Sequence, residues 1–329
     1  MNIKKVGLTA LAGSLVATTA FAGSLSLSGG AKLSYVTKDG SIDGGNVGGS
    51  YAMDQEISAS GSAELDNGMT ISLSHGLSGS GAEGSDSSVL TLDMGDMGKL
   101  SYDDTDGHFG LAGLEDKIPN AYEQANDGLG TTGTAATMAK MASGQGFGYS
   151  TSVGGASISI GYSDGLGATG NRSDGGQDTS TASTDSSSSI GITYAVDDLG
   201  LTVFGGVGSE GQADGKEIDH STLGATYAFG PATFGYQLND EDDSAAGGTD
   251  YETEIFGVSF MVNENFSISY GEHNTDKAGS SVDQEAESVQ ASYSMGGMTI
   301  NVKDSEMAGV AHTATNDHET TEVILIFAF

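Results

Sequence analysis

The sequence lacks cysteine and tryptophan, and its 329 residues include only 2 prolines and 11 basic side chains. The absence of cysteine excludes disulfide scaffolds, thiolate metal sites, iron–sulfur clusters and cysteine nucleophiles. With 45 acidic residues the formal net charge is −34, which argues against nucleic acid as a partner because a phosphate backbone requires a basic surface. The longest wholly apolar run after the N-terminal region is Val323–Phe329, whereas a transmembrane helix needs about 20 residues. Helical membrane proteins are therefore excluded.

The N-terminal 22 residues have the pattern of a secretory signal peptide of bacterial type. Lys4 and Lys5 are followed by small and apolar residues at 6–19 and by the A-x-A site Ala20–Ala22. We expect cleavage after this site, which leaves residues 23–329 as a single domain. An exported chain without disulfides needs another source of rigidity, and a closed β-barrel with every backbone group paired provides one.

Period-2 alternation runs through the chain, whereas helical periodicity is almost absent. Between Met53 and Leu65, for example, mainly apolar or small residues alternate with polar residues. Sixteen segments follow this pattern, at 24–36, 53–65, 69–77, 87–94, 98–104, 146–153, 156–163, 188–195, 201–208, 220–229, 232–239, 251–262, 266–273, 286–295, 298–304 and 319–329.

The connections between these segments alternate in length. Short turns such as Gly154–Gly155 and Gly296–Gly297 alternate with long polar stretches such as 209–219 and 305–318. Short turns at one rim and long loops at the other are typical of outer-membrane barrels. We therefore predict an all-β fold, a 16-stranded antiparallel transmembrane β-barrel with short periplasmic turns and long external loops. The alternative is a soluble β-sandwich, whose surface would normally carry more lysine.

The longest connection, residues 105–145, joins the fifth and sixth segments. A sixteen-stranded barrel is too wide to be filled by its own side chains, so we expect this third external loop to fold inward and narrow the lumen. Glu115, Asp116 and Asp127 would then face the passage and form an acidic constriction. The alternative is an external loop that caps the mouth.

These features together resemble the general bacterial porin family in its alphaproteobacterial branch. The resemblance covers the whole mature length and rests on the first strand Gly23–Tyr35, the hairpin Leu92–Tyr102, the segments Phe229–Tyr236 and Tyr293–Ile300, and a terminal strand ending in Phe329. It implies a constriction formed by the third external loop, homotrimers, and assembly by periplasmic chaperones and the barrel assembly machinery, which would read the strand ending in Phe329.

The chain departs from this family in its basic residues. Members usually oppose the acidic loop with arginines on the barrel wall, but Arg172 is the only arginine here and lies in a long connection. Alternation places Lys32, Lys99 and Lys303 on the lumen face, where they would form a thinner basic wall. An equally weighted alternative is that each lysine pairs with a neighbouring carboxylate.

Small residues at outward positions predict contact between subunits. Gly29 and Ala31 in the first strand, with Ala59, Gly61 and Ala63 in the second, leave a shallow surface that packs closely. We expect these two strands to lie at the trimer interface.

The strong negative charge predicts a cation-selective pore for passive diffusion of small hydrophilic solutes across the cell outer membrane, with membrane lipid as a further partner. The alternatives are a substrate-specific channel of the same fold and, less favoured, a secreted β-rich adhesin or surface protein. No catalytic motif occurs and the six histidines are scattered, so we expect no enzyme activity and no cofactor. Acidic loops such as 239–243 could hold Ca²⁺ loosely, although a solvated charge run explains them better.

Overall fold

The computed structural model describes residues 25–41, 48–78, 84–103, 109–127, 129, 146–163, 185–212, 215–245 and 247–329. The predicted signal peptide lies outside these residues, as do the ends of the predicted constriction loop, at 105–108 and 130–145.

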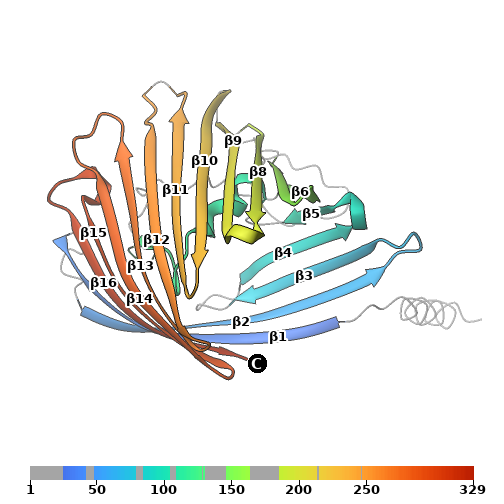
Figure 1. Ribbon diagram of the computed structural model, residues 1–329, viewed down its shortest axis with the longest axis horizontal. Helices are drawn as coiled ribbons and strands as arrows, with labels where there is room; N and C mark the ends of the chain where they lie inside the picture. The colour runs from blue at the N-terminus through green and yellow to red at the C-terminus, as the bar shows by residue number, and fades with distance from the viewer. Residues whose placement is uncertain are drawn as a thin grey trace, which may run out of the picture.

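Sixteen strands form one closed barrel in which each strand pairs antiparallel with both of its neighbours, as predicted (Figure 1). Strand β1 pairs with strand β16, so the sheet has no free edge. No helix within the described ranges is long and apolar enough to cross a bilayer. The strands are β1 Leu25–Asp39, β2 Gly48–Glu64, β3 Thr70–Ser78, β4 Gly84–Asp93, β5 Lys99–Asp103, β6 Gly146–Val153, β7 Ala156–Ser163, β8 Ser187–Val196, β9 Leu201–Gln212, β10 Lys216–Phe229, β11 Ala232–Asp243, β12 Tyr251–Asn263, β13 Phe266–Lys277, β14 Gln284–Met295, β15 Met298–Ala308 and β16 Asp317–Ala328.

The last residue completes the closure of the barrel. The amide of Gly29 donates to the carbonyl of Phe329 at 2.9 Å, and the amide of Phe329 donates back to Gly29 at 3.0 Å. A Cβ atom at Gly29 would lie 2.8 Å from the aromatic ring of Phe329. The ring of Phe329 therefore packs directly over the position that a side chain at residue 29 would occupy.

The two faces of the barrel wall differ as the alternation predicts. In β14, Val289 faces outward and is 61% exposed, whereas its neighbours Ser288 and Gln290 face the lumen and are each 2% exposed. Apolar side chains thus cover the outside of this part of the wall, and polar side chains line the inside.

The two rims also differ, and we call them the turn rim and the loop rim. Turns such as Gly154–Gly155 and Gly296–Gly297 close the turn rim, where the glycines at 154, 155 and 296 have φ of 59°, 86° and 61°. Such left-handed conformations favour glycine.

Toward the loop rim the strands are longer than alternation predicted. Strand β15 continues to Ala308 and β16 begins at Asp317, so the predicted long connection 305–318 is partly strand. The predicted connection 209–219 likewise lies mostly in β9 and β10. The alternation was missed because outward positions there carry carboxylates, such as Asp219 and Glu306, in place of apolar residues.

The third loop folds inward, as predicted. We call residues 109–127 the inner loop; it contains the 3₁₀ helix η4 (Gly110–Lys117), which lies inside the barrel (Figure 1). Its apolar residues pack against two buried side chains of the inner wall and hold the loop by burial of apolar surface. This cluster consists of Leu111, Leu114 and Ile118 with Phe204 of β9 and Ile255 of β12.

Glycines on the inner wall allow the loop backbone to approach closely. A Cβ atom on Gly257 would lie 2.6 Å from Ile118 Cγ2 and 2.7 Å from the Pro119 carbonyl oxygen, which leaves no room for a side chain. We call the lumen-facing glycines with such contacts the glycine track: Gly148, Gly161, Gly191, Gly206, Gly235 and Gly257.

We predict that Gly257→Ala destabilises the protein by about 1–3 kcal/mol, because the new methyl group overpacks the contact with the inner loop. Urea unfolding in detergent, followed by circular dichroism, measures this change. Gly271→Ala is the matched control, since a Cβ there lies 3.5 Å from the Phe256 carbonyl oxygen and 3.6 Å from Ala125 Cβ, which is ordinary contact. Equal losses in both variants would contradict the explanation.

Candidate functional site

The inner loop is held to the barrel wall through its own main chain. Lumen-facing side chains from five strands bind backbone N–H and C=O groups of the loop at 2.6–3.1 Å. These contacts are Ser159 with Gly110, Ser189 with Leu111, Ser269 with Ala121, Gln290 with Tyr122 and Glu123, and Lys303 with Gln124 and Asp127. The loop therefore crosses the lumen along a polar inner surface, from β7 to β15.

A group of charged residues lies where the loop meets β1 and β15. The Glu123 carboxylate lies 3.7 Å from Lys32 Nζ through one oxygen and 3.8 Å from Lys303 Nζ through the other. The Lys32 ammonium group also lies 5.5 Å from the centroid of the Tyr122 ring. We call Lys32, Tyr122, Glu123 and Lys303 the tip cluster; within it one carboxylate joins two lysines of the wall.

The two lysines of the tip cluster differ in access to the lumen. The Lys32 side chain is 40% exposed and that of Glu123 is 29% exposed, whereas Lys303 is completely buried. Lys32 and Glu123 therefore present charge to the open lumen, and Lys303 does not.

The acidic residues predicted for the constriction occupy different positions along the loop. Asp127 accepts a hydrogen bond from the Gln124 amide at 2.9 Å and closes a turn, while the Glu115 carbonyl accepts one from Gln124 Nε2 at 2.7 Å. Asp116 lies in η4, and its side chain is outside the described part of the structure. The carboxylate that meets both lysines is Glu123, which sequence reasoning did not select because nothing in the sequence specifies the path of the loop.

Lys99 lies apart from the tip cluster, near the turn rim. Its ammonium group is 3.0 Å from the Asp93 carboxylate in the neighbouring strand. It lines a cavity of about 730 Å³ between η4 and strands β5–β8, together with Lys117 and several serine hydroxyls. Lys32 and Lys303 thus share one carboxylate, and Lys99 belongs to a separate, hydroxyl-rich part of the lumen.

Further carboxylates face the lumen from β2. Asp54 and Glu56 alternate with Met53 and Ile57, which face outward and are 61% and 56% exposed. Asp54 is the register partner of Lys32 in β1. The wall beside the tip cluster is therefore acidic.

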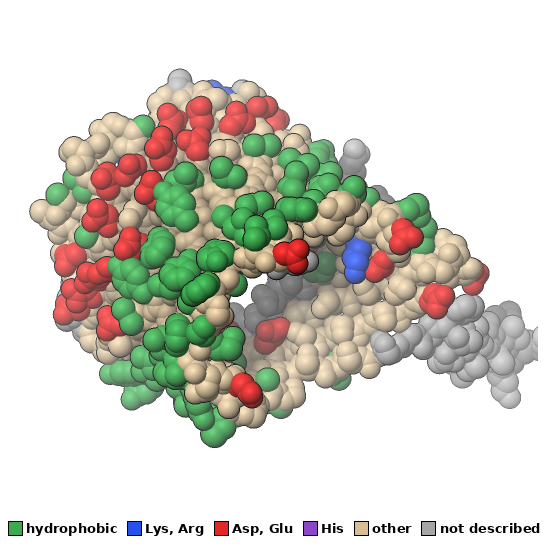
Figure 2. All heavy atoms as spheres, viewed as in Figure 1, with side chains coloured by type: hydrophobic (Ala, Val, Ile, Leu, Met, Phe, Trp, Pro, Cys, Tyr) green, Lys and Arg blue, Asp and Glu red, His purple; other side chains and the backbone are tan. Residues whose placement is uncertain are grey.

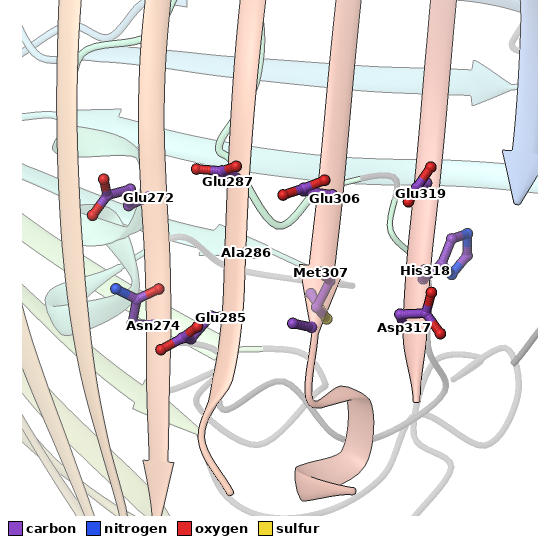
Figure 3. A pocket seen from close by; sticks show the side chains of 11 residues that line it. Glu272, Asn274, Glu285, Ala286, Glu287, Glu306, Met307, Asp317, His318 and Glu319 are labelled. Carbon is purple, nitrogen blue, oxygen red and sulfur yellow. The ribbon is translucent and has the colours of Figure 1, made fainter. Parts of the chain in front are cut away.

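Many of the other carboxylates face outward. Glu272, Glu287, Glu306 and Glu319 lie directly opposite one another in register across β13–β16, and they line a groove on the outer surface (Figure 3). We call these four residues the glutamate row. The Tyr270 hydroxyl lies 2.8 Å from a carboxylate oxygen of Glu272 and of Glu287. Like charges directly opposite in a sheet repel one another, so this row costs stability unless cations or protons offset it.

The same arrangement extends over the outside of β10–β16, where acidic side chains gather toward the loop rim (Figure 2). Outward positions in these strands also carry Asp219, Asp240, Asp242, Glu252, Glu254, Glu285 and Asp304. The net charge of −34 is therefore a poor measure of the charge inside the lumen.

The acidic run at 239–243, considered above for Ca²⁺, lies at the end of β11. Successive strand residues point to opposite faces, so Asp240 and Asp242 face outward while Glu241 and Asp243 face the lumen. Among the residues that the structure describes, no group of three or more histidine or carboxylate side chains is arranged to hold a metal ion.

Known proteins share both a sequence pattern and an architecture with this chain. A family model described as Gram-negative porin matches residues 7–323, and no curated protein matches the sequence. An anion-selective porin from Comamonas acidovorans is 15% identical, with a TM-score of 0.66 over 93% of this chain and 100% of that chain. A mutant of the Rh. blastica porin is 14% identical, with a TM-score of 0.64 over the same shares. At this identity the two likenesses establish the fold alone.

Proposed function

Since the chain belongs to the Gram-negative porin family, we propose that its barrel forms a water-filled outer-membrane pore that passes small hydrophilic solutes passively and prefers cations. The proposal rests on the position of the inner loop. The loop runs along the inner wall of a wide barrel, from β7 to β15, and presents the ion pair of Lys32 and Glu123 to the lumen. A barrel of this strand number encloses more space than its own side chains fill.

The preference for cations rests on where the lumen charges lie. Glu123 is paired with Lys32 and with the buried Lys303, and Lys99 is paired with Asp93, so these charges largely offset one another. Asp54 and Glu56 are exposed on the lumen face of β2, beside the tip cluster. Charges act within about a Debye length, roughly 10 Å at 0.1 M salt, so these carboxylates govern the ions that pass. The outward glutamate row is separated from the passage by the barrel wall.

We predict that the double variant Asp54→Asn/Glu56→Gln lowers the cation-to-anion permeability ratio by roughly twofold or more at about 0.1 M salt, where screening is moderate. The measurement is the reversal potential of single channels in a planar bilayer under a KCl gradient. Glu287→Gln/Glu306→Gln removes the same number of charges from the outer face and is expected to leave the ratio unchanged. Anion preference in the unmodified protein would overturn the proposed selectivity.

We also propose that the pore is a homotrimer whose interface includes the outer faces of β1 and β2. Ala31, Ala59, Gly61 and Ala63 leave shallow outward surface on these strands, which permits close packing. Gly29 lies on the same face, with the ring of Phe329 packed over it.

Ala59→Arg should dissociate the trimer, because a long charged side chain would separate the subunits. The oligomeric state is read by light scattering of the purified protein in detergent. Ala225→Arg on β10 is the control, since it places arginine on the outer face far along the barrel and carries a similar cost of up to about 2–4 kcal/mol in lipid. A trimer that persists in Ala59→Arg would place the interface elsewhere.

We further propose export through the signal peptide at 1–22, escort by periplasmic chaperones, and recognition of the terminal strand by the barrel assembly machinery. The support is the position of Phe329, whose main chain pairs with Gly29 at the seam of the barrel. A strand end that forms the last seam remains accessible until closure.

A further inference from the structure

Lys303 is the most unusual charged residue of the lumen because it is completely buried. Its Nζ donates to the carbonyl of Gln124 at 2.7 Å and to the carbonyl of Asp127 at 2.6 Å, and it lies 3.8 Å from the Glu123 carboxylate. Within the described residues, both hydrogen-bond acceptors and the ion-pair partner belong to the inner loop. A buried ammonium group is tolerated only where such partners surround it.

The contacts of Lys303 depend on the path of the loop backbone more than on loop side chains. Gln124 and Asp127 lie in one turn, in which the Asp127 side chain binds the Gln124 amide, so that their carbonyls converge on a single ammonium group. Gln290 in the adjacent strand binds the preceding stretch through the amides of Tyr122 and Glu123 at 3.0 and 3.1 Å. Two neighbouring strands thus hold residues 122–127 against the wall.

Lys32 meets the same Glu123 but cannot hold the loop equally well. Its contact is a single ion pair at 3.7 Å with a 40% exposed side chain, and exposed pairs of this kind are weak and screened by salt. Lys303, in contrast, is shielded from the ions of the lumen and makes two charge-assisted hydrogen bonds.

We propose that Lys303 is a positioning residue that sets the aperture of the pore by holding the inner loop against β14 and β15. The inference rests on the proposed function, because it assumes that the lumen conducts. With Lys303 removed, the segment 122–127 loses its buried anchor and moves off the wall into the passage, so that the channel becomes narrower and fluctuates.

The test compares Lys303→Met with the unmodified protein in a planar bilayer. We expect the mean single-channel conductance to fall by roughly 1.5-fold or more, with added current noise, because the released segment enters the space that the wide barrel leaves open. Lys277→Met is the matched control and should leave the conductance unchanged. Lys277 also faces the lumen, but its ammonium group lies over the Tyr251 ring and not against the described part of the inner loop.

A crosslink between the inner loop and the wall distinguishes the anchoring of the loop from the effect of the Lys303 charge on the current. The Ala121 amide lies 2.8 Å from Ser269 Oγ, and the chain has no cysteine of its own, so Ala121→Cys/Ser269→Cys is the pair chosen for a disulfide between loop and wall, with its formation checked by loss of free thiols. Added to Lys303→Met, the oxidised pair should return the conductance to within the unmodified range, and reduction should lower it again.

The outcomes are distinct. If the unmodified protein inserts but conducts nothing, the proposed channel function fails. If it conducts and Lys303→Met is indistinguishable from it, or if the oxidised crosslink does not restore the conductance, the positioning role is overturned and the channel function stands. Should Lys303→Met not fold, Gln290→Ala tests the same anchorage with the same crosslink, because it removes the three backbone contacts to residues 122 and 123.

Discussion

A backbone that faces hydrocarbon must satisfy each of its N–H and C=O groups within the protein, and the architecture of this chain depends on that requirement. Sixteen strands meet it by closing on themselves, and the seam between β1 and β16, which Gly29 and Phe329 extend, removes the last free edge. Closure leaves an interior too wide for the wall side chains to fill. The inner loop occupies part of that space, and the glycine track allows its backbone to lie directly on the wall.

The carboxylates of the barrel wall are divided between its lumen face and its outer face. Carboxylates such as Asp54 and Glu123 face or border the lumen, while the glutamate row lies on the opposite side of the wall toward the loop rim. Total charge therefore carries less information about selectivity than the face on which each residue lies. The same separation explains why a short list of lumen residues controls the proposed preference for cations.

The number of strands, their antiparallel order and the inward course of the third loop could be predicted from the sequence. Period-2 alternation and the alternation of short turns with long loops depend on local geometry, which the sequence specifies directly. Strand ends near the loop rim were missed where Asp219 and Glu306 replace apolar residues at outward positions. The partners of the loop were not predictable either. Lys303 and Gln124 are 179 residues apart in the chain, and only the path of the loop through the closed barrel brings them together.

Besides the apolar packing of Leu111, Leu114 and Ile118, the wall binds the inner loop through atoms that every amino acid possesses. Ser159, Ser189, Ser269, Gln290 and Lys303 bind the peptide backbone, so exchanging a loop side chain leaves these hydrogen bonds in place. Mutation can therefore alter the charge or bulk that the loop presents to solutes without redesign of its attachment. The selectivity of the barrel can therefore change readily in evolution. The loop side chains that face solutes can vary while the wall residues that bind the loop backbone stay constant.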